Sequence, residues 1–455
     1  MDDNLNATNL HRTAKYFMDS GRAKTHEEAM ELLNSFGLTI HVDSSIANSI
    51  HHQAALFTLV NLARRTLLAG IEVIGVPNSP SLSTFALGQT IAEAVVGLGG
   101  RLVDKARSDW PSALIGDIPV SHPKLPAWQL TWSGWRGGVV PISDGRRLLE
   151  AEAIGPAPIL AAAACAAEAF SYHARDHVLA GHRVSGLSLW RPGSEWLIED
   201  VDEPSLSYLP SRLWFIGLGN LGQAFSWVLA SLRYADPKEV KLVLQDFDRI
   251  AVSNESTSLL SSVHDLNRRK ARVVAEWLDL RGFDTFIEER TFGEWTKRSQ
   301  DEPAVALCGV DNALARASLE KPGFGLVVEA GLGGGPQAFR SFSMHTFPAS
   351  RSADEIWSRQ VGQVDVIIEA IPAYLALKRS GMESCGLATL ASRAVGVPFV
   401  GLIAACLVFS ELLRRLNGGK SYELVSGSAA SLADVETVAM PSSPYAFGHV
   451  LAAMN

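Results

Sequence analysis

A glycine turn between an apolar strand and a helix constrains this chain more than any other feature. From Trp214 the chain reads WFIGLGNLG, with glycines at Gly217, Gly219 and Gly222, and a helical stretch then runs to about Arg233. Glycines in this spacing let backbone N–H groups and a helix N-terminus approach a phosphate. The turn therefore predicts a nucleotide-binding α/β domain. The turn alone does not separate a dinucleotide from ATP.

Strands and helices alternate after this turn. We expect strands at 212–216, 240–245, 284–288, 304–309 and 325–329, and helices from the glycine turn to about 233, at 268–280 and at 397–416. Alternation of this kind is typical of a mostly parallel sheet covered by helices on both faces. The fold class of this half is therefore α/β.

The first half of the chain repeats this order. We expect helices at 52–68 and 89–98 and strands at 71–76, 101–104, 113–116 and 138–142, the last two matching 306–309 and 325–329. The Ala-rich helix after Pro158, with Cys165, matches the helix after Pro398, with Cys406. These matches favour two doubly wound domains related by duplication. The alternative is the general likeness of any two α/β domains.

The first copy lacks the residues that a nucleotide needs. Where the glycine turn would stand, the chain reads IANSIHHQAALF, so the backbone cannot approach a phosphate closely. We predict a helical lead over 1–40, an inactive copy over 41–204, and an active domain over 205–455. A polar insert is expected at 341–384, between the fifth strand and the last helix.

Polar residues after the glycine turn favour ATP over a nicotinamide. Asp246 ends the second strand, where a carboxylate accepts hydrogen bonds from ribose hydroxyls. Asp248 and Asn254 follow, and a nicotinamide site has no standing need for them; an ordinary turn is the alternative. Lys270 begins a helix beside Arg268 and Arg269, where three cations oppose the helix dipole unless an anion lies there; a solvated helix face is the alternative.

Asp311 and Asn312 follow the next strand of the sheet. They stand at the carboxyl edge, where α/β ligands bind. A carboxylate at this edge can hold Mg²⁺ beside phosphates. We therefore predict Asp311 as the metal ligand.

In this order the residues resemble the ThiF/MoeB and ubiquitin-activating enzyme family, over about 205–416. The resemblance implies two Rossmann-like, ThiF-type domains, and ATP with Mg²⁺ used to adenylate the C-terminal glycine of a ubiquitin-like protein. The chain most resembles the activating proteins of bacterial ubiquitin-like (Bil-type) conjugation operons. This resemblance implies a role in antiviral defence and a conjugating enzyme as partner. The predicted ATP-binding residues are Gly217, Gly219, Gly222, Asp246, Asp248, Asn254, Lys270, Arg269 and Asn312, with Lys270 and Asp311 as catalytic residues.

Two departures from the family pattern stand out. Thr257 and Ser258 occupy the place of an Arg-Gln pair, so an arginine must come from elsewhere. The candidates are Arg268, Arg269, Arg12, Arg22, Arg64 and Arg65. The paired CxxC zinc site of many members is missing, so no zinc is expected.

Family members that pass the carrier onward use a cysteine in the segment crossing the active site. Cys385 follows the polar insert and precedes Arg393, whereas Cys165, Cys308 and Cys406 lie in apolar elements. By elimination we predict Cys385 as the thioester nucleophile. A sulfur-carrier adenylyltransferase without a thioester and an NAD-dependent oxidoreductase are the alternative functions.

Composition excludes other classes. A net charge of -8 argues against nucleic acid as the main partner. The apolar run 394–409 is shorter than the roughly 20 residues that a membrane span needs. The polar N-terminus does not resemble a signal peptide. We expect a cytoplasmic protein, either a pseudo-dimeric monomer or a homodimer.

Overall fold

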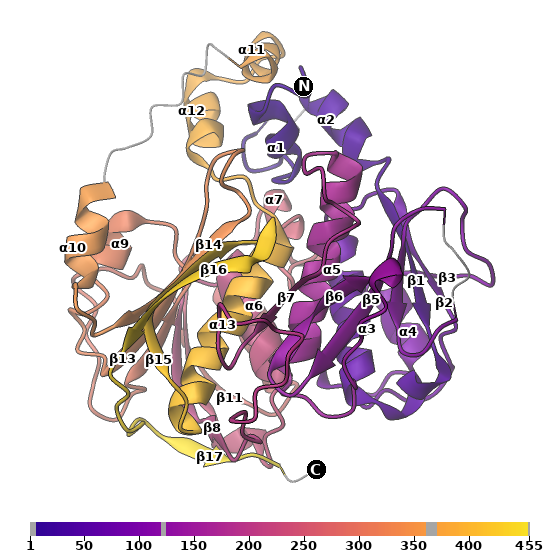
Figure 1. Cartoon of the computed structure of the whole chain (residues 1–455). Coiled ribbons are helices and arrows are strands. Elements are labelled where there is room, and N and C mark those ends of the chain that lie inside the picture. Colours follow the sequence, from indigo (N-terminus) through magenta and orange to yellow (C-terminus); the bar gives the residue numbers. More distant parts are fainter. Residues whose placement is uncertain (1–5, 120–123, 361–370, 454–455) are drawn as a thin grey trace.

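Two sheets with the same internal order form the framework of the molecule. The computed structural model describes residues 6–119, 124–360 and 371–453. The first sheet has the order β3-β2-β1-β4-β5-β6-β7, and the second has the order β11-β10-β9-β12-β13-β14-β15-β16 (Figure 1). A short separate pair joins β8 (Tyr208–Pro210) to β17 (His449–Leu451).

The strands of the first sheet begin earlier in the chain than expected. Their bounds are β1 (Gly37–Val42), β2 (Gly70–Ile74), β3 (Arg101–Leu102), β4 (Ser112–Ile115), β5 (Ala127–Ser133), β6 (Arg136–Pro141) and β7 (Ser185–Ser188). Strand β1 was not predicted, and it starts before the expected domain boundary at residue 41. It is the central strand from which the parallel order extends in both directions.

The second sheet closely follows the predicted strands and then extends further. Its bounds are β9 (Arg212–Ile216), β10 (Lys241–Gln245), β11 (Asp284–Glu288), β12 (Val305–Cys308), β13 (Leu326–Leu332), β14 (Ser341–Phe347), β15 (Ser421–Ser428) and β16 (Ser431–Met440). Residues 341–347, expected in the polar insert, instead form a strand antiparallel to β13. Burial alternates along this strand, so its polar residues lie on the partly exposed face of the sheet.

The pairing directions confirm two copies of one topology. In each half the first five strands are parallel and the next are antiparallel. One predicted match is wrong. Strand β5, and not 138–142, takes the place of β13, because 138–142 falls in and just after the antiparallel strand β6.

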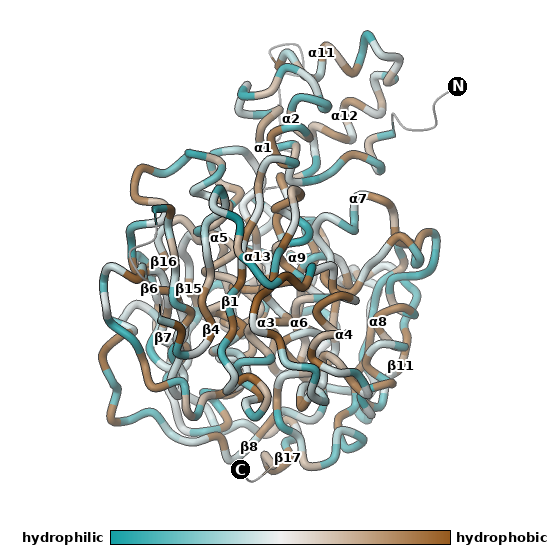
Figure 2. The backbone as a smooth tube through the Cα atoms, turned by 90° about the vertical axis from the view of Figure 1, so that its right-hand side faces the viewer, coloured by the Kyte–Doolittle hydropathy of each residue, from teal (hydrophilic) through white to brown (hydrophobic). Residues whose placement is uncertain are grey.

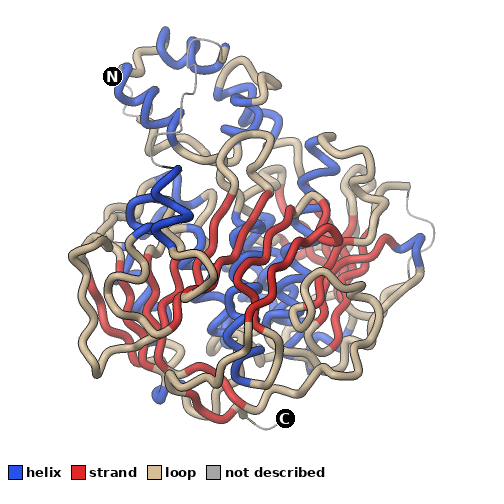
Figure 3. The backbone as a smooth tube through the Cα atoms, turned by 60° about the vertical axis from the view of Figure 1, so that its left-hand side comes forward, coloured by secondary structure: helices blue, strands red, loops and turns tan. Residues whose placement is uncertain are grey.

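Four helices buried on nearly every side fill the space between the sheets. They are α3 (Ile50–Ala63), α5 (Pro156–Ala174), α6 (Asn220–Ala230) and α13 (Pro398–Leu416), and Figure 3 shows helices lying between two groups of strands. Helices that are apolar all round require such a position. Across this interface the rings of Phe85 and Trp227 stack with centroids 4.1 Å apart. The two halves therefore share one core.

A small helical lobe stands above the sheets, as Figure 2 shows. It joins α1 (Ala14–Asp19) and α2 (His26–Leu33) of the predicted lead to α11 (Pro372–Arg379) and α12 (Ser384–Ser392). The Thr25 side chain caps α2 by accepting the Glu28 N–H, as predicted. The Tyr374 hydroxyl donates to Asp19 at 3.0 Å. Residues 361–370 of the predicted insert lie outside the described ranges.

The remaining helices are short or peripheral. Their bounds are α4 (Ile91–Gly97), α7 (Val252–Glu255), α8 (Lys270–Asp279), α9 (Ala313–Ala317) and α10 (Ala353–Trp357). No helix within the described ranges is both long enough and apolar enough to span a membrane.

Candidate active site

The glycine turn lies between β9 and α6, as the sequence predicts. Gly217 has a φ of +81°, and a Cβ there would meet Val310 Cγ1 at 2.7 Å. A Cβ at Gly222 would meet the Gly217 carbonyl oxygen at 2.0 Å, so the helix can only start this close to the turn with glycine. A Cβ at Gly219, by contrast, would meet nothing within 4 Å. The open side of the turn therefore faces space beside the N-terminus of α6, where a phosphate can bind.

Asp246 holds this turn in place from the end of β10. Its Oδ2 accepts the Leu218 N–H at 2.6 Å, and its Oδ1 accepts the Asp248 N–H at 2.7 Å. Burial raises the pKa of Asp246, while Lys270 and the two N–H groups act against this increase. A carboxylate has capacity for further donors, so these bonds leave room for ribose hydroxyls.

Lys270 and Asp248 form an ion pair beside the turn. Lys270 Nζ lies 2.8 Å from Asp248 Oδ2, and the Lys270 N–H donates to the Asp248 carbonyl oxygen at 3.0 Å. The neighbouring cations face other groups. Arg269 donates to the Phe247 carbonyl oxygen, and Arg268 pairs with Asp265 and Glu276. Of the three predicted cations, Lys270 is the one placed beside Asp246 and the turn.

Asn254 closes a turn at the start of α7. Its side-chain oxygen accepts the Ala251 N–H at 2.8 Å, which is the contact that an ordinary turn would make.

The loop that follows α7 is held by the first half of the chain. Arg65, just after the C-terminal end of α3, is buried and donates to the carbonyl oxygens of Leu259, at 2.9 Å, and of Ser261. Arg65 is therefore occupied in fixing the loop that contains Thr257 and Ser258.

Asp311 and Asn312 lie between the end of β12 and the start of α9. Both are exposed, and Asn312 caps the helix by accepting the Leu314 N–H at 2.9 Å. At the far end of α9, Arg316 pairs with the buried Glu329 of β13 at 3.0 Å. This pair attaches α9 to the sheet and so sets the direction of the Asp311 segment.

Arg12 of the N-terminal lead completes this edge. Its N–H donates to Ser256 Oγ at 3.1 Å, and its Nε donates to the Ala394 carbonyl oxygen at 3.1 Å. Gly396 lies between Arg12 and Thr257: a Cβ there would meet the Thr257 side chain at 2.6 Å. Burial and the charge of Arg393 lower the pKa of Arg12 to about 10, and Asp311 opposes that change.

Of the arginines considered, Arg12 therefore takes the place beside Thr257. The partly buried guanidinium groups of Arg12 and Arg393 lie near each other, and the Asp311 carboxylate lies near Arg12. An anion between them would offset their repulsion. The sequence includes Arg12 among six candidate arginines but gives no reason to prefer it, because 244 residues separate Arg12 from its partner Ser256.

The matching edge of the first half is closed by its own side chains, which the sequence did not reveal. His52 Nε2 lies 3.2 Å from Glu150 Oε2, and Arg147 Nε lies 2.8 Å from Glu150 Oε1. Glu150 is buried and has a φ of +53°. The carboxylate of Asp43 lies against Gly116, where a Cβ would meet it at 2.3 Å. No glycine turn precedes α3 here, and carboxylates occupy the edge.

Cys385 stands apart from the other three cysteines. It is exposed, at the second position of α12, whereas Cys165, Cys308 and Cys406 are buried. Burial raises the pKa of Cys308 to about 12 and also raises the pKa values of Cys165 and Cys406. Only Cys385 is therefore accessible to a protein partner. It lies in the helical lobe with the N-terminal lead (Figure 2).

Two Rossmann-like halves, one with an open glycine turn and one closed, define an E1-type activating enzyme. The chain belongs to the BilD family: the BilD N-terminal domain model matches residues 37–189 and the BilD C-terminal domain model matches residues 209–419. A protein from Collimonas sp. (strain OK412), "Bacterial E1-like protein BilD", is 60% identical over 452 residues, covering 99% of this chain and 98% of that protein. The resemblance to the Bil-type activating proteins is thereby confirmed.

Solved structures of MccB are more distant. "Crystal structure of E. coli MccB" has 10% sequence identity and a TM-score of 0.33, and the match covers 52% of this chain and 63% of that chain. "Crystal structure of E. coli MccB + ATP" has 11% identity and a TM-score of 0.33, with 51% and 65% covered. This chain thus spans less than two thirds of the MccB chains that it matches.

Proposed function

We propose that the second half of this chain uses ATP to activate the C-terminal carboxylate of a ubiquitin-like protein as an acyl-adenylate. The observation that supports this most is the convergence of Lys270, Asp311 and Arg12 on the open edge beside the glycine turn. A charge-neutralising edge suits this reaction, because the attacking carboxylate is already ionised and pyrophosphate must leave.

Each residue has a role in this reaction. The turn and the N-terminus of α6 bind phosphate oxygens, and Asp246 accepts bonds from ribose hydroxyls. Lys270 and Arg12 stabilise charge on the phosphates as a carboxylate oxygen bonds to the α-phosphorus and the bond to the bridging oxygen breaks. Asp311 would hold Mg²⁺, which supplies further charge neutralisation between phosphate oxygens. Asp311 is exposed and offers one carboxylate, which suits an ion whose other ligands are phosphate oxygens and water.

The second step of the proposal places the carrier on Cys385. The thiolate attacks the acyl carbon, the bond to AMP breaks, and a thioester remains; the thiol proton passes to solvent. The carrier then moves to a conjugating enzyme. The antiviral setting and the cytoplasmic location stay predictions.

Exchange of labelled pyrophosphate into ATP tests the first step. With the ubiquitin-like protein present, Lys270→Ala and Asp311→Ala should each lower exchange by about 100-fold or more. Arg272→Ala is the matched control, because Arg272 lies on the same helix with a side chain 63% exposed. Exchange that needs no carrier protein, or that survives both variants, would reject the proposal.

A thiol-sensitive adduct tests the second step. Cys385→Ala should leave exchange intact and abolish the ATP-dependent carrier adduct that thiols remove. Cys406→Ala keeps the exposed thiol and should form the adduct. An adduct on Cys385→Ala would show that another nucleophile is used, and no adduct on either protein would favour an adenylyltransferase that stops at the first step.

A further inference from the structure

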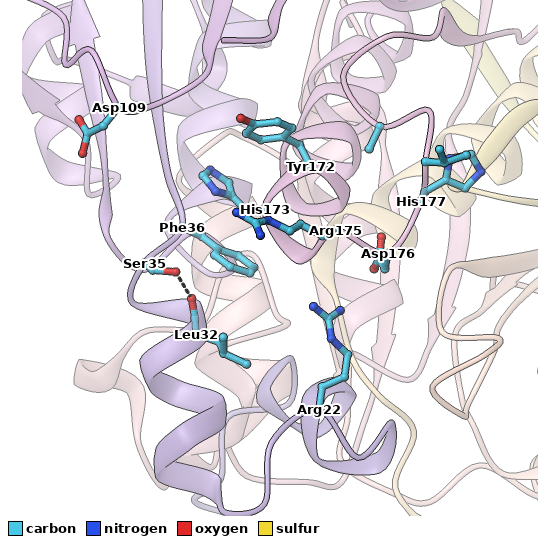
Figure 4. A pocket seen from close by; sticks show the side chains of 12 residues that line it. Arg22, Leu32, Ser35, Phe36, Asp109, Tyr172, His173, Arg175, Asp176 and His177 are labelled. Atoms are coloured by element: carbon cyan, nitrogen blue, oxygen red, sulfur yellow. Dashed lines mark hydrogen bonds between the residues drawn. The ribbon is translucent and has the colours of Figure 1, made fainter.

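A cavity of about 850 Å³ lies in the first half, away from the nucleotide edge. Figure 4 shows it between the end of α2, the start of β1 and the C-terminal end of α5. Arg22 extends toward the end of α5, where Phe36, His173 and Arg175 surround the same space. None of these residues has a role in the reaction proposed above.

The free charge in this cavity is positive. Among the described residues, the Arg175 guanidinium makes no hydrogen bond or ion pair. The Arg22 guanidinium donates to the Tyr16 hydroxyl at 3.4 Å and lies over the Phe17 ring, 5.2 Å from its centroid, so it has no carboxylate partner among these residues. The two carboxylates of the lining are already neutralised. Asp109 pairs with Arg107 at 2.8 Å, and Asp176 pairs with Arg340.

The histidines of the lining add no charge near neutral pH. Burial lowers the pKa of His173, whose Nε2 lies 2.8 Å from the Gly37 carbonyl oxygen. Desolvation and the nearby charge of Arg183 also lower the pKa of His177. An anion in this cavity would therefore interact with Arg22 and Arg175.

The backbone at Arg175 is unusual for an arginine. This residue ends α5 with φ 50° and ψ 41°, the left-handed conformation that glycine adopts most easily. A side chain larger than hydrogen is disfavoured there. A strained residue with an unpaired charge, directed at a cavity, is a sign of a binding role.

We propose that this cavity binds an acidic peptide segment of a partner protein. Carboxylates of the segment pair with Arg22 and Arg175, since guanidinium groups bind carboxylates in a bidentate manner. An apolar residue of the lining, Val178, is 92% exposed, and the next residue in the chain, Leu179, is 53% exposed. Arginine beside exposed apolar side chains is typical of protein interfaces and favours a peptide over a small enclosed anion.

Fluorescence anisotropy with the full chain and no ATP tests this proposal. The probe is the fluorescein-labelled peptide Gly-Glu-Glu-Leu-Glu-Glu-Leu-Gly, compared with the same peptide carrying Gln for Glu. We expect the acidic peptide to bind at least about tenfold tighter than its Gln counterpart. The double variant Arg22→Glu/Arg175→Glu should lose at least about tenfold in affinity. Arg290→Glu, with a side chain 82% exposed in the other half, should lose nothing.

A second variant separates binding from folding. Arg175→Gly should weaken peptide binding while raising the unfolding midpoint, because glycine relieves the left-handed strain. Equal affinity in the wild type and the double variant, or no binding to the wild type, would overturn the proposal. If inorganic phosphate binds through Arg175 and the peptide does not bind, the cavity is a small-anion site and the proposal is also overturned. The assay needs no adenylation, so its failure leaves the proposed function untouched.

Discussion

The two halves of this chain have the same strand order and opposite chemistry at their carboxyl edges. In the second half, a glycine turn leaves open space at Gly219, and Lys270 and Arg12 bring positive charge. In the first half, the carboxylates of Asp43 and Glu150 fill the equivalent edge, and Glu150 is paired with Arg147. A phosphate can approach the open backbone of one edge, whereas side chains fill the other. The same strand order therefore leaves the carboxyl edge of the sheet open or closed, depending on a few side chains.

The first half also contributes to the edge of the second half. Arg65 holds the loop after α7, and the lead that precedes β1 supplies Arg12. The closed half thus contacts and holds parts of the open edge. The comparison is therefore between a half proposed to bind the nucleotide and a half that holds its loops.

The largest effect is expected from removing the arginine supplied by the lead. Arg12→Ala should lower carrier-dependent pyrophosphate exchange by about 100-fold, because one phosphate contact is lost while β9 and its turn stay intact. Lys24→Ala, at an exposed residue of the same lead, is the control and should leave exchange unchanged. Equal exchange in Arg12→Ala and the wild type would show that the second half works without the first.

A smaller effect is expected from opening the closed half. Glu150→Ala removes a buried carboxylate that faces His52 and Arg147, and it should lower the free energy of unfolding by about 3 kcal/mol. Exchange at saturating ATP should not change. Chemical denaturation measures the first quantity.

The control for this variant is an exposed pair in the same loop. Asp144→Ala removes the partner of Arg146, whose side chain is 56% exposed, and should cost no more than about 0.5 kcal/mol. A comparable loss in both variants would mean that Glu150 has no special role in closing the edge.

The last effect is spread over several pH units and concerns the pH dependence of stability. Burial lowers the pKa of His11, next to Arg12, from 6.5 to about 4. Below pH 6.5 the unfolded chain binds a proton that the folded chain rejects, so stability falls by about 1.4 kcal/mol per pH unit until about pH 4. His11→Gln should flatten this part of the profile, whereas His264→Gln, at an exposed residue, should not. Parallel profiles for His11→Gln and the wild type would contradict the assignment.

Much of the second half could be predicted from its sequence. Strands 212–216 and 284–288 match β9 and β11 because short apolar or β-branched runs bounded by turn residues specify them locally. The glycine turn was equally clear, since its spacing encodes its own geometry. The duplication followed from the element order and from the matching helices after Pro158 and Pro398, which carry Cys165 and Cys406.

What the sequence could not show depends on contacts between distant residues. Strand β1 lies in a segment with weak local signals and gains its place only by pairing with β2 and β4. Strand β14 looked like a polar insert because one of its faces is only partly covered. Arg12, the closing of the first edge by Glu150, and the cavity at Arg175 all join segments from separate parts of the chain.

Nucleotide stoichiometry tests the central claim most directly. Calorimetric titration of the full chain with MgATP should give a single site per chain. Lys270→Ala should remove or strongly weaken it, and His52→Ala in the first half should leave it unchanged. Two sites per chain, or a single site lost in His52→Ala and kept in Lys270→Ala, would contradict the assignment of an open second half and a closed first half.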